Sequence, residues 1–424
     1  MHMRYLIALF SLLIILSVPY EAQAEEMVTV KLVKDIGNTS EVKIKLHGDY
    51  LTLDPSIQLK EGVTYKLRVK RSGSFYLISN SDEQKIDGAF MLIPSIYDTN
   101  HYIEINGQPH LGVIEFTEEK QKYIRPVNQL PLEDYLKGVV PFEVFPSWNL
   151  ETLKAQALAA RTYAFTQKEK EMNDTIQYQV YGGFTWNPET TKAVEETKGE
   201  IITHNGTPIT AFYSASNGGM TENNSNVWGG DSISIYPIKE DKYDPIHPWE
   251  FSFHREQLAI ENIDWDQSDA WDSLTEMDER IATNMKKSLR QKGYLGEIKI
   301  LSIPEFEISK KRNESGRTEE GSMTVSFLHQ LFDGTIMYEQ LELKNTNINK
   351  IRPLIGGDVF RSYLIDSLTY NEDLYTMNGR GYGHGVGMSQ WGASIMGDQG
   401  KNYKEILQFY FPQTEITNMS KISK

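Results

Sequence analysis

The stretch Val139–Phe165, VVPFEVFPSWNLETLKAQALAARTYAF, is expected to organise the chain around it. A short apolar segment that contains one carboxylate, Glu143, is followed at once by a predicted helix. Asn149 or Ser147 is expected to cap this helix, because short polar side chains accept hydrogen bonds from the first helical N–H groups. Leucines and alanines then recur at helical spacing and leave little polar surface, which predicts a buried helix.

Arg161 shares the apolar stripe of this helix with Leu153, Ala157 and Leu158. A buried guanidinium must be paired, because an unpaired buried charge is too costly. The residues alone leave two interpretations open. The stretch holds either a structural ion pair or capped turn, or a site with an acid in an apolar pocket and a cation on the next helix.

The N-terminus has the pattern of an export signal. Met1–Arg4 is basic, Tyr5–Ser17 is apolar, and Ala22-Gln23-Ala24 is a small-residue cleavage pattern. This order predicts a signal peptide at residues 1–24 and a secreted or cell-wall protein. An uncleaved N-terminal anchor is the alternative. No later stretch is long and apolar enough to predict a transmembrane span.

Composition narrows the function classes. The chain has 424 residues, no cysteine and a formal net charge of -15. Without cysteine there are no thiolate zinc ligands and no cysteine nucleophile. The negative charge argues against nucleic acid as a partner, since that needs a basic surface. The length predicts two or three domains.

The order of elements predicts a mixed α+β protein. Residues 25–121 are β-rich and are expected to form an accessory domain, and residues 122–424 a larger catalytic-type domain with an inserted or subsidiary segment at 249–370. In the second domain, Pro188–Gly199 reads as a helix, Tyr178–Gly183 as a strand, and Asp358–Leu364 as a short helix.

A second unusual stretch is Thr210–Asp231, TAFYSASNGGMTENNSNVWGGD. Its small hydroxyl and amide residues offer many donors and acceptors, which suits a polyhydroxylated ligand, and Trp228 could supply a stacking face for a sugar ring. A tight, self-bonded turn region explains the same composition equally well.

The third unusual stretch is Gly379–Ala393, GRGYGHGVGMSQWGA. Its glycine spacing does not match a dinucleotide or phosphate loop. A glycine at every second position favours close approach of another backbone or of a ligand. His384, Ser389 and Gln390 are the polar candidates. No Cys, Asp or Glu stands beside His384, so no metal site is expected here.

Together, the segments PLEDYLKGVVPFEVFPSWNLETLKAQALAARTYA, YSASNGGMTENNSNVWG and GRGYGHGVGMSQWGA resemble the stage II sporulation protein D / LytB family, over roughly Pro126 to Phe411. The resemblance implies a peptidoglycan protein of spore-forming bacteria. Sporulation-type members are lytic transglycosylases that cut glycan strands already stripped of stem peptides. LytB-type members are modifiers of an N-acetylmuramoyl-L-alanine amidase, and the β-rich N-terminal region is closer to that branch.

By the same resemblance, the catalytic glutamate falls on Glu143. The other motif positions expected to line the groove are Arg161, Tyr213, Ser214, His384, Ser389 and Gln390. Close pairing of Arg161 with Glu143 would lower the pKa of that acid, so Arg161 is expected to anchor substrate or neighbouring side chains instead. Some sporulation-type members use cysteine in a zinc site. This chain has no cysteine, so neither zinc nor another cofactor is expected.

The sequence therefore predicts lytic transglycosylase-type cleavage of glycan strands, with Glu143 as the general acid and base and an amidase as the partner. Such an enzyme needs one carboxyl group, because the muramic acid 6-hydroxyl is the internal nucleophile. The alternative from another class is a non-catalytic enhancer of the amidase. A sugar-binding module alone would explain Thr210–Asp231 but not Glu143.

Overall fold

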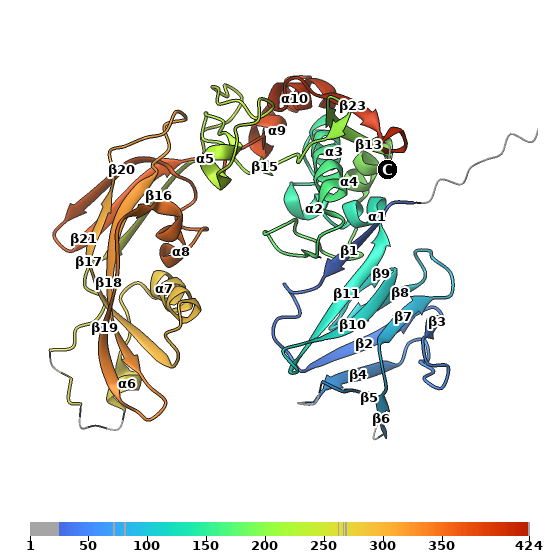
Figure 1. The fold of residues 1–424 in the computed structure, drawn as a ribbon, viewed down its shortest axis with the longest axis horizontal. Helices are drawn as coiled ribbons and strands as arrows, with labels where there is room; N and C mark the ends of the chain where they lie inside the picture. Colours follow the sequence, from blue (N-terminus) through green and yellow to red (C-terminus); the bar gives the residue numbers. More distant parts are fainter. Residues whose placement is uncertain are drawn as a thin grey trace, which may run out of the picture.

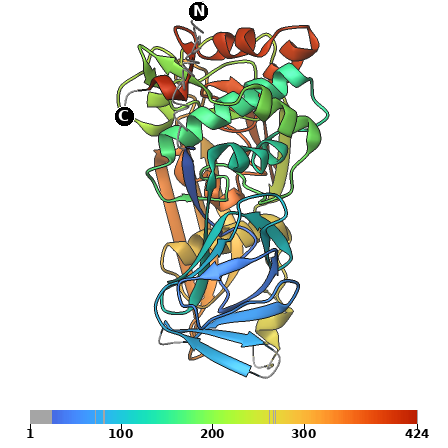
Figure 2. The same ribbon diagram turned by 90° about the vertical axis from the view of Figure 1, so that its right-hand side faces the viewer.

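The computed structural model describes residues 25–70, 73–79, 82–261, 263–265, 267 and 269–422. The predicted signal peptide, residues 1–24, lies outside the described residues. Figure 1 shows three parts: β-sheets at the lower right (blue), a second β-rich part at the left (yellow and orange), and a helical part above and between them (green and red). Figure 2 agrees that both β-rich parts extend from the same side of the helical part.

The N-terminal part consists of two six-stranded sheets. Their strands alternate buried and exposed residues, as in β2, where Val42, Ile44 and Leu46 are buried, because successive side chains point to opposite faces. In spatial order, the first sheet is β12 (Met172–Asn173), β1 (Met27–Lys31), β11 (Tyr123–Pro131), β10 (Val113–Glu119), β7 (Phe90–Pro94) and β3 (Tyr50–Thr52). The second is β6 (Asp82–Ile86), β5 (Phe75–Ser79), β4 (Thr64–Val69), β2 (Glu41–His47), β8 (Tyr102–Ile105) and β9 (Gln108–Leu111).

The first sheet continues past the predicted boundary at residue 121. β11 pairs antiparallel with β10 and with β1, with Val28 opposite Leu130. The chain leaves β11 directly into α1 (Leu132–Lys137), α2 (Val140–Glu143) and α3 (Leu150–Gln167). The sheets and these helices therefore meet without a linker.

The helix α3 is buried on both sides, as its sequence predicts. Leu153, Ala157 and Ala160 pack into the cluster of the two N-terminal sheets. Leu158 and Ala159 pack into a separate cluster formed with the C-terminal segments. The other elements of the helical part are α4 (Pro188–Glu196), β13 (Glu200–His204), β14 (Thr207–Pro208), β15 (Tyr213–Ser214), α5 (Asn224–Trp228), β22 (Met388–Ser389), α9 (Gln390–Asp398), α10 (Tyr403–Tyr410) and β23 (Glu415–Asn418).

The third part contains the segment 249–370 and has its own hydrophobic cluster, which includes Phe253, Met285 and Phe327. This cluster supports the proposal that the segment is a subsidiary unit. Its sheets are β16–β21–β20 and β17–β18–β19. The bounds are β16 (Pro248–His254), α6 (Ala270–Ser273), α7 (Glu279–Gln291), β17 (Glu297–Ile308), β18 (Glu320–Gln330), β19 (Ile336–Asn347), α8 (Arg352–Ile355), β20 (Leu364–Asn371) and β21 (Leu374–Arg380).

The mixed α+β class is confirmed, and two local predictions are wrong. Asp358–Leu364 is not a helix: the helix α8 ends at Ile355, because Gly356 has φ +108° and leaves the helical conformation. Tyr178–Gly183 is not a strand, since the chain there is irregular. Among the described residues, no helix is long and apolar enough to cross a membrane.

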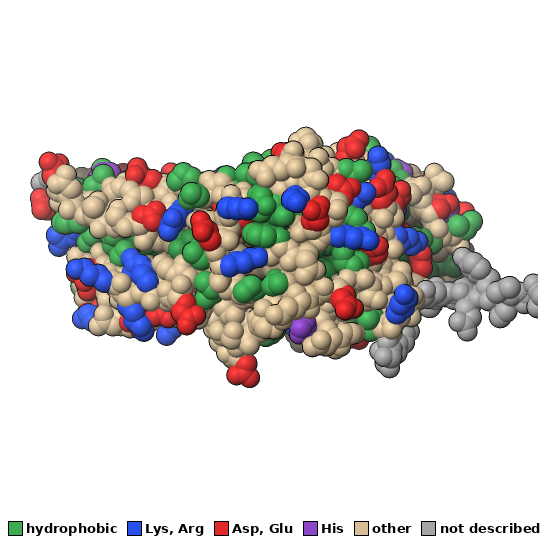
Figure 3. Space-filling view, turned by 90° about the horizontal axis from the view of Figure 1, so that it is seen from above, with side chains coloured by type: hydrophobic (Ala, Val, Ile, Leu, Met, Phe, Trp, Pro, Cys, Tyr) green, Lys and Arg blue, Asp and Glu red, His purple; other side chains and the backbone are tan. Residues whose placement is uncertain are grey.

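Side chains of both charge signs lie among hydrophobic ones on the face seen from above in Figure 3, with several Lys and Arg side chains gathered at its left end.

Candidate functional site

The turn between α2 and α3 positions Glu143. Glu143 is the last residue of α2, and the chain becomes extended at Val144. The next helix begins at Leu150, where the Asn149 side chain accepts a hydrogen bond from the Glu151 N–H at 2.9 Å and acts as the predicted cap. The acid therefore lies in a short connection that is fixed at both ends by helices.

The carboxyl group of Glu143 lies in a desolvated but hydrogen-bonded environment. The Val180 N–H donates to its Oε1 at 2.8 Å. Burial raises the pKa of Glu143 from 4.5 to about 7, and hydrogen bonds from Val180, Gln390 and Tyr213 oppose part of this increase. As a whole residue Glu143 is still partly exposed. A partly accessible acid that is about half protonated near neutral pH can both give and take a proton.

A buried chain of side chains holds the Tyr213 hydroxyl beside this acid. Gln179 donates from Nε2 to the Tyr213 hydroxyl at 3.0 Å, and the Tyr135 hydroxyl donates to Gln179 Oε1 at 3.2 Å. Because the Tyr213 oxygen accepts from Gln179, its own proton is free to point at Glu143. Tyr135, Gln179 and Val180 are not among the predicted site residues, since they lie outside the three motifs or carry no distinctive chemistry by themselves.

The second and third unusual stretches lie against each other. β15 and β22 pair in parallel, with Tyr213 opposite Met388 and Ser214 opposite Ser389. The Gly385 N–H donates to Ser214 Oγ at 3.2 Å. The glycines therefore allow the close backbone approach that their spacing predicted.

His384 is uncharged in this setting. Its Nδ1 accepts a hydrogen bond from the Val386 N–H at 3.0 Å, which leaves the ring proton on Nε2. Burial and the nearby positive charge of Arg317 lower the pKa of His384 to about 4. Its ring lies 5.1 Å from that of Trp228, which is 51% exposed and stacks on Phe212 at 4.3 Å. These rings form an aromatic surface next to Tyr213.

Gln390 lies beside the acid, whereas Ser389 is engaged in the backbone framework. Gln390 Nε2 donates to the main-chain oxygen of Glu143 at 3.1 Å. Ser389 is buried, donates to Asp244 Oδ2 at 2.7 Å and caps α9 by accepting from the Gly392 N–H at 3.0 Å. Ser389 thus fixes the start of the helix that carries Gln390.

Arg161 is not brought to Glu143. Its guanidinium is fully buried and forms a bidentate ion pair with Glu133, at 2.9 Å from Nε to Oε1 and 2.8 Å from Nη2 to Oε2. It also donates to the Val194 carbonyl at 2.9 Å. These contacts join α1, α3 and the C-terminal end of α4.

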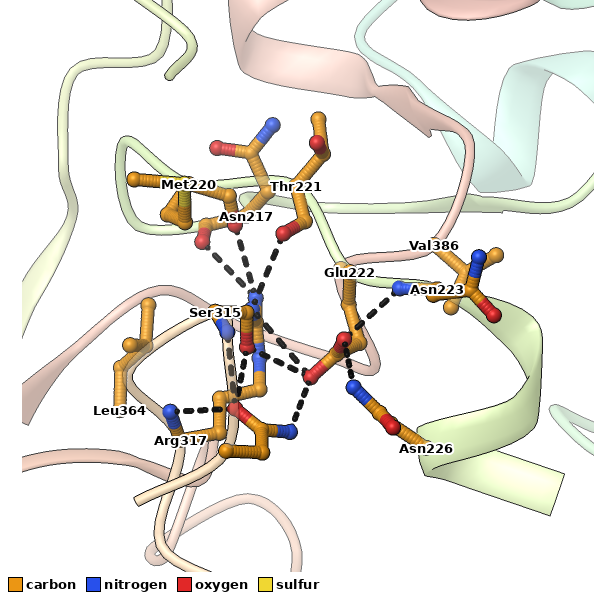
Figure 4. A network of polar contacts seen from close by, with 12 residues as sticks. Asn217, Met220, Thr221, Glu222, Asn223, Asn226, Ser315, Arg317, Leu364 and Val386 are labelled. Carbon is orange, nitrogen blue, oxygen red and sulfur yellow. Dashed lines mark hydrogen bonds and ion pairs between the residues drawn. The ribbon is translucent and has the colours of Figure 1, made fainter. Parts of the chain in front are cut away.

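A polar network joins the loop after β15 to the third part of the molecule (Figure 4). The buried carboxylate of Glu222 accepts hydrogen bonds from Asn313 Nδ2 at 2.8 Å and from Ser315 Oγ at 2.6 Å. Arg317 donates from Nη2 to the main-chain oxygens of Asn217 and Met220, both at 3.0 Å. This network fixes the small-residue loop from the side of the subsidiary segment.

In the part of the chain that the structure describes, no group of three or more His, Cys, Asp or Glu side chains is arranged to hold a metal ion.

Replacing Gly383 with valine is expected to destabilise the protein by about 1–3 kcal/mol through overpacking. Gly383 has φ +111°, and a Cβ there would lie 2.6 Å from Ser214 Cβ. Gly334→Val is the matched control, because Gly334 also has a positive φ, +88°, but nothing within 4 Å of its Cβ position. Urea unfolding of both variants measures the difference. If both variants lose the same unfolding free energy, the close contact between Gly383 and Ser214 does not contribute to the destabilisation.

Comparison with known proteins shows which family the chain is similar to. Residues 120–204, which include Glu143, match the model of the family described as Stage II sporulation protein (SpoIID). The chain is 37% identical over 388 residues to the Amidase enhancer of Bacillus subtilis (strain 168), covering 90% of this chain and 54% of that protein. It is 27% identical over 314 residues to the Stage II sporulation protein D of the same organism, covering 69% of this chain and 76% of that protein.

These matches confirm the resemblance that the three motifs predicted. The chain spans only about half the length of the amidase enhancer that it matches.

Proposed function

We propose that this chain is an exported cell-wall protein that cleaves denuded glycan strands of peptidoglycan as a lytic transglycosylase. The proposal starts from the match of the chain to the stage II sporulation protein (SpoIID) family. Glu143 is the general acid and base. The observation that carries the proposal is the raised pKa of Glu143, about 7, in a partly exposed position next to Tyr213 and Gln390.

The reaction needs only one carboxyl group. Glu143 protonates the glycosidic oxygen as the bond from that oxygen to the muramic acid C1 breaks. The resulting carboxylate then takes the proton of the 6-hydroxyl as O6 bonds to C1, which leaves a 1,6-anhydro end and restores the acid. Most glycosidases pair two carboxylates across the bond. The hydrogen-bond partners found for Glu143 are an amide N–H, a phenol and an amide side chain, which fits the one-carboxyl scheme.

The neighbouring groups have supporting roles in this scheme. Tyr213 and the Val180 N–H stabilise the carboxylate form between the two proton transfers, since hydrogen bonds to the charged form favour it. Trp228 offers a half-exposed ring to a sugar, and Ser214 and His384 shape the loop beneath it. Arg161 is proposed to act only through the packing of α1, α3 and α4.

The alternative is a non-catalytic enhancer of an N-acetylmuramoyl-L-alanine amidase. The similarity to a protein named Amidase enhancer favours it, and so does the presence of two N-terminal sheets that contribute nothing to the contacts of Glu143 described above. Under either function, peptidoglycan glycan strands and a cell-wall amidase are the proposed partners.

The deciding experiment incubates the purified protein with denuded glycan strands, and with intact wall plus an amidase, and analyses the products by mass spectrometry. The enzyme hypothesis expects 1,6-anhydro ends from denuded strands without any amidase present. Absence of such ends, together with faster release of stem peptides by the amidase, would replace it with the enhancer hypothesis.

A further inference from the structure

We propose that the rings of Phe145, Trp148, Trp391 and His247, here called the aromatic ledge, bind a hexosamine ring of the glycan strand next to the bond that Glu143 protonates. This inference rests on the proposed function, because it takes the glycan strand as the ligand. It adds a sugar subsite that the three sequence motifs and the comparisons do not assign.

The ledge is a continuous group of rings from three separate segments. The ring of Phe145 lies 5.5 Å from that of Trp148 and 5.9 Å from that of Trp391. Trp148 and Trp391 meet edge to face at 5.0 Å, and His247 meets Trp391 edge to face at 5.1 Å. Such contacts hold aromatic side chains in fixed orientations.

The ledge is also open to solvent. Phe145 is 57% exposed, and Trp148, Trp391 and His247 are only partly buried. Large apolar side chains gathered at the surface mark binding sites more often than single exposed ones do. None of the four side chains carries a fixed charge, so the ledge suits the C–H face of an uncharged sugar ring.

The ledge is attached directly to the acid. Phe145 follows Glu143 by two residues, and Gln390, whose amide donates to the Glu143 carbonyl at 3.1 Å, immediately precedes Trp391. The backbone N–H of Trp391 also donates to the carbonyl oxygen of Ala215 at 3.0 Å, and Ala215 lies two residues after Tyr213. Glu143 is thus linked through Gln390 to the ledge and through Tyr213 to the rings of Phe212 and Trp228.

The backbone that carries His247 is held in a strained conformation. Ile246 has φ +67° and His247 has φ +46°, a region that a β-branched residue rarely adopts. The Gly381 N–H donates to both of their carbonyl oxygens, at 2.8 and 3.0 Å, and Asp244 accepts from the Ile246 N–H at 2.8 Å. Strain that is maintained in this way concentrates at functional sites, and here it places the His247 ring against Trp391.

Glu143 is connected to two aromatic groups, to the ledge through Gln390 and to the Phe212–Trp228 pair through Tyr213. A strand that contacts both groups is expected to bring a glycosidic bond to the acid. The ledge is therefore expected to contribute to binding rather than to proton transfer.

The test measures binding in a Glu143→Gln background, so that cleavage does not interfere. The probe is denuded glycan strands, and the signal is the fluorescence of the tryptophans, with calorimetry as a second measurement. Phe145→Leu, which keeps an apolar side chain but removes the ring, should weaken binding roughly tenfold, the effect of truncating an aromatic anchor. Phe145→Tyr should bind within about twofold of the parent, because it keeps the ring.

Phe332→Leu is the matched control, because Phe332 is 90% exposed in the turn between β18 and β19. It should bind like the parent. Binding of Phe145→Leu within about twofold of the parent would overturn the ledge while the proposed function stands. If the Glu143→Gln parent does not bind denuded strands at all, both the ledge and the proposed function are overturned.

Discussion

Cleavage of denuded glycan strands is expected to fall by about a hundredfold to ten-thousandfold when Glu143 is replaced with glutamine, the range that a general acid and base contributes. The amide keeps the size of the side chain and can still accept a hydrogen bond from the Val180 N–H. It cannot exchange a proton at neutral pH. Binding of the strands should persist, because the aromatic rings and the small-residue loop are unchanged.

The same variant gives a second readout, the dependence of stability on pH. The pKa of Glu143 is about 7 in the folded protein and is expected to be near 4.5 when unfolded. The stability that the protonated form contributes is fully present below about pH 4.5 and is lost as the pH rises through 7. The wild type therefore loses about 3 kcal/mol of unfolding free energy between pH 4.5 and pH 8, because the pKa of Glu143 is higher by roughly 2.5 in the folded state. Glu143→Gln has no such loss, so its stability relative to the wild type should rise by this amount over the same pH range.

Glu189→Gln is the control for both readouts, because Glu189 is an exposed acid in the first turn of α4. It should leave cleavage, and the dependence of stability on pH, as they are in the wild type. If Glu143→Gln produces 1,6-anhydro ends as fast as the wild type does, the assignment of Glu143 as the general acid and base is refuted. If the wild type produces none and both proteins stimulate an amidase equally, the enhancer hypothesis is correct.

Replacing Arg161 with methionine is expected to destabilise the protein by about 3–5 kcal/mol, the cost of breaking a buried ion pair from one side. The Glu133 carboxylate would be left with the Gly199 N–H, at 3.1 Å, and without its cation. Urea unfolding measures the loss. Activity per folded molecule should stay near the wild-type value, because the partners of Arg161 lie on α1, α4 and β13.

Two controls separate structure from substrate binding. Arg161→Met combined with Glu133→Gln should lose less stability than Arg161→Met alone, since no uncompensated charge remains. Lys401→Met, which removes an exposed partner of Glu405, should cost at most about 1 kcal/mol. If Arg161→Met stays stable but no longer binds glycan, Arg161 contributes to the substrate groove, as the resemblance implied, and not only to packing.

The helix α3, the candidate acid and the close contact of the glycine-rich stretch could be predicted from local sequence patterns. The apolar periodicity and the cap at Asn149 predicted α3 and its burial, because a helix that is apolar on most faces can only be stable between two hydrophobic layers. The motif and the apolar run predicted Glu143 as the acid, and the structure shows that burial raises the pKa of this residue. The alternating glycines predicted the close approach that Gly383 and Ser214 make.

Other features depend on long-range packing and could not be predicted from local sequence. Tyr178–Gly183 has the composition of a strand, but no strand among the described residues pairs with it, and the Val180 N–H donates to Glu143 instead. Arg161 had to be paired, but its partner on another helix, Glu133, is a long-range contact that periodicity cannot specify. The aromatic ledge likewise joins residues 145, 148, 247 and 391. Such contacts depend on how separate segments pack, and local sequence fixes only the conformations that each segment favours alone.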